Sequence, residues 1–176
     1  MSQSSKHVEW CLNKAKKEVE ECKEQGKRLK HRGLLKSNPN LEEARKHLAK
    51  AEHNFLGITR FKEIGFSDWS ISAGFYCIYH CFLAIAAKFG YESANQTGTI
   101  SLMRFLKESN LIQLDEKFIE LLEYEEMEDI KENSVIDMRE DYTYGVQIMV
   151  KDEAKINNLK NTCKELIDIT KQIIYE

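Results

Sequence analysis

Residues 69–87 read WSISAGFYCIYHCFLAIAA and contain no charged side chain, in a chain of 176 residues of which 31% are charged. Apolar side chains recur here at alternating steps of four and three, which places them on one face of an α-helix. They are Ile71, Phe75, Ile78, Phe82, Ile85 and Phe89. Small residues form a second row, and Trp69, Tyr76 and His80 form a third. We therefore predict a helix that is buried on nearly every side and forms the centre of the fold.

A transmembrane helix is the alternative reading of this stretch, because its nineteen uncharged residues almost suffice to cross a bilayer. Two serines, a glycine, a histidine and two tyrosines interrupt the stretch, and the mean hydropathy of the chain is −0.52. The first twenty residues are charged throughout and lack the apolar core of a secretory signal. We therefore expect a cytoplasmic protein with no membrane span.

The composition predicts one all-α domain over residues 1–176. The chain has one proline and no run of alternating polar and apolar residues, which argues against a sheet. Its five cysteines are an odd number without CxxC spacing, which favours reduced thiols in a reducing compartment. Helical periodicity then predicts an up-and-down bundle of four to five main helices.

The expected elements follow from the positions of apolar rows and capping residues. A polar surface loop is expected over residues 91–99, and Gly90 is expected to end the central helix in the left-handed conformation. Asn38 or Asn40, Ser67 or Asp68, and Asp152 are predicted to cap helices. Helices are predicted over residues 5–32, 41 to about 65, 67–89, 100–108, from Asp115 with Met127 and Ile130 facing inward, and from 153 to the C-terminus.

The net charge is only −3, but it is unevenly distributed. Residues 27–36 hold five basic side chains and a histidine without an acid, whereas residues 115–141 hold twelve acids and three basic residues. Such a dipolar chain fits either self-association and steering of a charged partner, or two solvated helix faces.

Motifs of several enzyme classes are absent from the sequence. There is no phosphate-binding P-loop, no GxGxxG after a strand and no GxSxG, and inward Glu-x-x-His pairs of a di-metal bundle are also missing. Cys77, His80 and Cys81 share one helix, but a metal site needs ligands from a second element. We therefore predict no metal, no cofactor, and a packed His80.

Residues 137–145, DMREDYTYG, form the strongest candidate site. The planar guanidinium of Arg139 suits a phosphate or a carboxylate, with Asp141, Tyr142 and Tyr144 close by in the sequence. Arg139 can therefore bind a phosphate, or it can brace the structure by pairing with Asp137, Asp141 or the acidic fifth helix.

Three motifs occur in a characteristic order: HLAKAEHNFLG at residues 47–57, FYCIYH at residues 75–80, and Arg-x-Asp-Tyr at residues 139–142 before a last amphipathic helix. Together they resemble the HEPN family, the higher eukaryotes and prokaryotes nucleotide-binding domain, and in particular its small stand-alone prokaryotic members. The resemblance covers residues 41–174 and leaves residues 1–36 as an additional N-terminal helix.

This resemblance implies a helical bundle that forms a homodimer, with a cleft for a nucleotide or RNA at the dimer junction. Many HEPN proteins are ribonuclease toxins of toxin–antitoxin pairs or are encoded beside a minimal nucleotidyltransferase. Active members carry an arginine and then, after four to six residues, a histidine. Arg139 matches the arginine, but Tyr144, Gly145 and Val146 occupy the positions of the histidine. An imidazole exchanges protons near neutral pH and a phenol does not, so cleavage would lose its main participant.

Three hypotheses follow. The first is a non-catalytic HEPN-like module that binds a nucleotide, RNA or a minimal nucleotidyltransferase partner through Arg139, Asp141, Tyr142 and Tyr144. The second is a metal-independent ribonuclease in which Arg139 holds the phosphate and His80 or Tyr144 replaces the missing histidine. The third is a purely structural interaction module that docks a partner through the first helix and its basic end.

Overall fold

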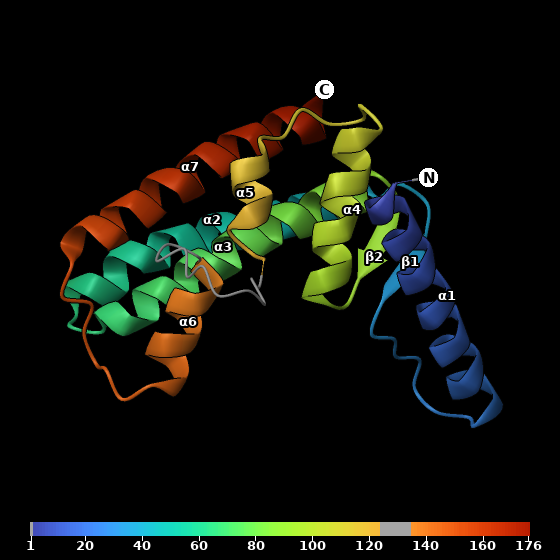
Figure 1. The fold of residues 1–176 in the computed structure, drawn as a ribbon, viewed down its shortest axis with the longest axis horizontal. Helices are drawn as coiled ribbons and strands as arrows, with labels where there is room; N and C mark the ends of the chain where they lie inside the picture. Colours follow the sequence, from blue (N-terminus) through green and yellow to red (C-terminus); the bar gives the residue numbers. More distant parts are fainter. Residues whose placement is uncertain (1, 124–134) are drawn as a thin grey trace.

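The computed structural model describes residues 2–123 and 135–176, which form seven helices and one small sheet (Figure 1). The predicted all-α class and helical bundle are confirmed. The elements in chain order are α1 (Gln3–Glu24), β1 (Leu34–Lys36), α2 (Leu41–Glu63), α3 (Ser67–Lys88), β2 (Tyr91–Ser93), α4 (Gln96–Glu108), α5 (Glu116–Glu120), α6 (Val135–Tyr144) and α7 (Glu153–Tyr175).

Helix α3 is the central element, as predicted. It packs against α2, α4, α6 and α7, and Ile78 and Phe82 are completely buried. Among the described helices α3 alone is long and apolar enough to cross a membrane, and 78% of its most apolar stretch is buried inside the structure. The row of α3 that carries Trp69 and Tyr76 is the exception to this burial, because these two side chains are about half exposed. The side of α3 that carries these two aromatic residues is therefore open to solvent.

Helices α2 and α3 form an antiparallel pair joined by a short turn (Figure 1). Asn40 caps α2 by accepting a hydrogen bond from the Glu43 amide, and Gly90 follows α3 at φ +74°, both as predicted. The predicted cap by Ser67 or Asp68 is wrong. Ser67 is the first residue of α3, and its hydroxyl accepts a hydrogen bond from the Val150 amide at 2.9 Å instead.

The predicted first helix of residues 5–32 is too long, because α1 ends at Glu24. Gly26 adopts φ +61°, and the chain then turns back along α1 into β1, which pairs antiparallel with β2. The expectations of no strand and of a loop over residues 91–99 are therefore wrong at these positions. Strands of three residues are too short to show the alternation that identifies a strand in a sequence.

The C-terminal half follows the predicted order with shifted boundaries. Helix α4 begins at Gln96, four residues earlier than predicted, because the Asn95 side chain caps it. The short α5 begins after Asp115, near the predicted start, and Asp115 caps it, whereas Asp152 caps α7 as predicted. Helix α6 lies where the apolar periodicity is weak, and the predicted inward residues Met127 and Ile130 lie outside the described residues.

Candidate functional site

Helix α6 carries the predicted site residues and lies against α3. The hydroxyl groups of Ser72 in α3 and Thr143 in α6 are 2.9 Å apart and form a hydrogen bond. Val135 and Ile136 are buried at the start of α6, whereas its last residue, Tyr144, is 76% exposed. Helix α6 is therefore buried at its N-terminal end and is also joined to α3 by Thr143 near its C-terminal end, where Tyr144 extends into solvent.

Arg139 lies at the interface of α6 and α3. Its guanidinium carbon is 4.3 Å from the centre of the Phe75 ring, close enough for a cation–π interaction. One terminal nitrogen is 3.5 Å from the neighbouring Glu140 carboxylate, and Nε is buried without a hydrogen-bond partner. Among the described residues, Arg139 pairs with Glu140 and not with Asp137 or Asp141 as expected, and most of the predicted acidic fifth helix, the third expected partner, lies outside the described residues. A guanidinium held by an aromatic ring, with an unused N–H group, has capacity for another acceptor.

The other predicted residues of α6 differ in their exposure. Tyr142 packs partly against the hydrophobic core, so it stabilises α6 on α3. Asp141 and Tyr144 extend into solvent. Of the residues predicted to bind a ligand, Arg139, Asp141 and Tyr144 therefore have a polar group or ring that a ligand can use.

His80 lies in a different environment, against His47 of α2. The two Nδ1 atoms are 3.1 Å apart, so one ring holds the proton of this hydrogen bond and the other accepts it. Burial, together with the nearby His47 and Lys50, lowers the pKa of His80 to about 4. His80 follows Phe75 by five residues, which is a rotation of about 140° around the helix. The structure therefore does not bring His80 beside Arg139, which lies over Phe75.

We name the place where Arg139 of α6 lies over Phe75 of α3 the α3–α6 corner. A groove between α2 and α3 opens beside this corner, and it was not predicted from the sequence. Its volume is about 520 Å³, and Leu56, Trp69 and Tyr76 on its walls are each about half exposed or more. Asn54 also lines it, and the Asn54 amide nitrogen is buried without a hydrogen-bond partner. Ser72 lines the groove and bonds to α6, so the groove and the Arg139 helix are neighbours. The third row of the central helix was the sequence signal for this surface.

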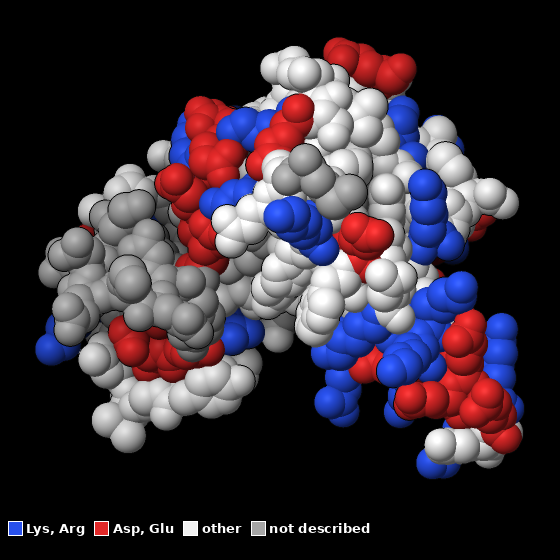
Figure 2. All heavy atoms as spheres, turned by 45° about the vertical axis from the view of Figure 1, so that its right-hand side comes forward, with Lys and Arg blue, Asp and Glu red and all other residues white. Residues whose placement is uncertain are grey.

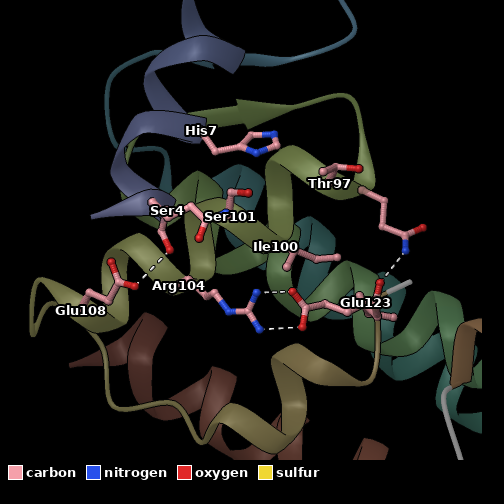
Figure 3. Close-up of a pocket in the computed structure, with 11 residues that line it drawn as sticks. Ser4, His7, Thr97, Ile100, Ser101, Arg104, Glu108 and Glu123 are labelled. Atoms are coloured by element: carbon pink, nitrogen blue, oxygen red, sulfur yellow. Dashed lines mark hydrogen bonds and ion pairs between the residues drawn. The ribbon is translucent and has the colours of Figure 1, made fainter. Parts of the chain in front are cut away.

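A larger polar cleft of about 750 Å³ lies between α1, α4 and the residues that follow α5. His7 of α1 lies across from Thr97 and Ser101 of α4, and Arg104 pairs with Glu123 (Figure 3). Arg104 also donates to Glu116 at 2.8 Å, and these bonds, that with Glu123 first, raise its pKa. Because two carboxylates already neutralise Arg104, this cleft is a weaker anion site than the α3–α6 corner.

Three cysteine thiols are buried where α3 meets α7: Cys77, Cys81 and Cys163. The hydrogen bond between Cys77 and Cys163 is the main cause of the raised pKa of Cys77, and the hydrogen bond between Cys81 and Cys77 is the main cause of the raised pKa of Cys81. Thiols that stay protonated are poor nucleophiles and poor metal ligands. Among the described residues, no group of three histidine, cysteine or acidic side chains is placed to hold a metal ion.

No protein-family model matches the sequence, and no curated protein is similar to it. Function is therefore inferred from the residues and their placement.

Proposed function

We propose that this chain is a HEPN-like helical module that forms a homodimer and binds a nucleotide or RNA without cutting it. The observation that carries the proposal is Arg139, whose guanidinium lies 4.3 Å from the centre of the Phe75 ring with its Nε–H unused. A phosphate oxygen can accept from the terminal N–H groups of this guanidinium, because the Arg139 side chain remains 18% exposed, and hydrogen bonds to charged partners are the stronger ones. On the same helix the exposed Asp141 can accept from ribose hydroxyls, and Tyr144 offers a ring and a hydroxyl group.

The groove between α2 and α3 supports the homodimer. Leu56, Trp69 and Tyr76 expose apolar surface at one place, and such patches mark interaction sites. A second copy that covers the groove would also lie near α6, because Ser72 joins the two. The dimer would then place two Arg139 helices close to one shared ligand.

The placement of His80 supports binding without cleavage. Metal-independent cleavage needs a group beside the phosphate that exchanges a proton near neutral pH. His80 is the histidine considered for this role, but it is hydrogen-bonded to His47, and its pKa of about 4 leaves it neutral at pH 7. RNA bound at Arg139 is therefore expected to stay intact.

The test is the affinity of the purified protein for a fluorescent ATP analogue and a short labelled RNA. Arg139→Ala should weaken binding by about tenfold or more, since a hydrogen bond to a charged group contributes about 1.5–3 kcal/mol. Arg139→Lys should restore part of it, because lysine keeps the charge but not the planar fork. Arg45→Ala is the matched control, since Arg45 also lies over an aromatic ring, that of Tyr175.

Three outcomes would overturn the proposal. Binding by the native protein that Arg139→Ala leaves unchanged, or no binding at all, removes the site. Cleavage of the RNA that is lost in both Arg139→Ala and His80→Ala would instead establish the ribonuclease alternative.

A further inference from the structure

The outer face of α1 exposes a tryptophan among lysines. Trp10 is 56% exposed. Lys6 lies four residues before it, and Lys14 and Lys17 lie four and seven residues after it, so all four side chains share one side of the helix. The Lys14 ammonium is 5.1 Å from the centre of the Trp10 ring. The opposite side of α1 packs against α4 and β1, so this face is the one open to solvent.

The segment after α1 adds further positive charge next to this face. The chain turns back along the helix, where the Cys22 thiol donates to the Lys30 carbonyl oxygen and the Arg32 amide donates to Glu18. Residues 14–36 contain nine basic and four acidic side chains, a net charge of +5 in a chain of net charge −3. Figure 2 shows this basic region where α1 projects from the body, interspersed with acidic side chains.

These basic side chains have no carboxylate partners, unlike others in the described residues. Lysines on the remainder of the molecule pair with acids, for example Lys46, Lys117 and Lys171. In the part of the chain that the structure describes, no ion pair involves the lysines and arginines of the outer α1 face or of the segment after it, whereas His31 of that segment contacts Glu92 at 3.2 Å. We name two neighbouring groups together the α1 basic face: Lys6, Trp10, Lys14 and Lys17 on the outer side of α1, and Lys27, Arg28, Lys30 and Arg32 in the segment that turns back along the helix.

We propose that the α1 basic face binds single-stranded nucleic acid, with bases stacked on Trp10 and phosphates held by the lysines and arginines. Proteins that bind single strands combine exposed aromatic rings with a positive track for the backbone. This surface has both parts, and it lies outside the α3–α6 corner. The inference therefore goes beyond the proposed function and does not rest on it.

Other polyanions fit the α1 basic face less well. Binding at a lipid surface needs an apolar helix face that inserts between the lipids, but the apolar face of α1 is buried in the protein. A duplex keeps its bases stacked inside and would leave Trp10 unused. An acidic protein segment would match the charge but not the exposed ring.

The experiment measures binding of the full chain to fluorescent oligouridine and oligothymidine of about 20 nucleotides, at several salt concentrations. If four phosphates are contacted, affinity should fall about 50-fold between 50 and 200 mM salt. Replacing Lys6, Lys14 and Lys17 together by Gln should reduce the slope of log affinity against log salt by about 2. Trp10→Ala should weaken binding by about tenfold, and Trp10→Phe should retain most of it because phenylalanine still stacks.

Joint replacement of Lys46, Lys117 and Lys171 by Gln is the matched control, because it removes the same charge elsewhere. An equal loss of affinity in this control would show that binding depends on net charge alone, and it would overturn the proposal. Absence of binding at about 50 mM salt would overturn it as well. Binding to phosphatidylserine vesicles and not to the oligonucleotides would also overturn the proposal. A change of oligomeric state in the Lys6, Lys14 and Lys17 variant would overturn it too. Failure here is separable from failure of the proposed function, because Arg139→Ala leaves the α1 basic face intact.

Discussion

Two tryptophans are exposed to nearly the same degree, 56% for Trp10 and 51% for Trp69, but their surroundings are opposite. Trp69 lies beside Leu56 and Tyr76 at an apolar groove, whereas lysines surround Trp10 on α1. An exposed aromatic ring therefore does not by itself define a partner. The charge and polarity of its neighbours decide whether it suits a protein surface or a nucleobase.

Both surfaces depend on one hydrophobic core. Val8 of α1 and Leu34 of β1 belong to the same buried cluster as Phe82 of α3. Removal of residues 1–36 would therefore expose core positions, and point substitutions separate the two surfaces better than truncation does.

The largest expected effect is a loss of stability in the hydrophobic core on which both tryptophan surfaces depend. Phe82 is completely buried, so Phe82→Ala should lower the free energy of unfolding by about 3–5 kcal/mol through lost burial and a cavity. Urea denaturation followed by circular dichroism measures it. A loss below about 1 kcal/mol would mean that α3 is not the centre of a packed core.

The next effect distinguishes the roles of Trp69 and Trp10 in self-association. Trp69→Lys should weaken self-association by about 30-fold, the equivalent of about 2 kcal/mol for an interface hot spot, because it places a charge in an apolar contact. Trp10→Lys should leave self-association unchanged. Sedimentation velocity over a concentration series measures both, and dissociation by the Trp10 variant alone would reverse the assignment.

A smaller effect tests how the basic segment is held on α1. A Cβ atom at Gly33 would lie 2.5 Å from the Cys11 carbonyl oxygen and 3.1 Å from the Ala15 Cβ atom. Gly33→Ala should therefore destabilise the protein by about 1–3 kcal/mol through overpacking. Gly57→Ala is the control, because its nearest neighbours are at 3.5 Å and alanine favours the helix. Equal stability of the two variants in urea would contradict this packing.

The smallest effect concerns pH and the His47–His80 pair. The folded state lowers the pKa of His80 from 6.5 to about 4, so folding favours its neutral form. Its contribution to stability is present above pH 6.5 and is lost as the pH falls toward 4. His80→Gln should flatten the decline of Tm in this window. A decline equally steep in the variant would assign it to carboxylates instead.

The sequence predicted the elements whose residues carry strong local signals. The apolar row through Phe82 identified the central helix, and Asn40, Gly90, Asp115 and Asp152 marked helix ends because capping is a contact between near neighbours. The end of α1 and the strand β1 were missed, since β1 is defined by pairing with β2 far along the chain. The role of the site remains a proposal. Arg139 was identified by its motif, but its contact with Phe75 joins two helices that are distant in the sequence.

By itself, the sequence determined the helical class, the buried central helix and the uneven charge, because periodicity and composition are local properties. It also determined that Tyr144, Gly145 and Val146 follow Arg139 where a histidine would complete the motif of the resemblance. Only the tertiary structure placed Arg139 over Phe75 and His80 against His47, and left the groove beside Trp69 open. The physical reason is that the exposure and partners of a side chain depend on which helices pack together, and that packing is set by contacts between residues far apart in the chain.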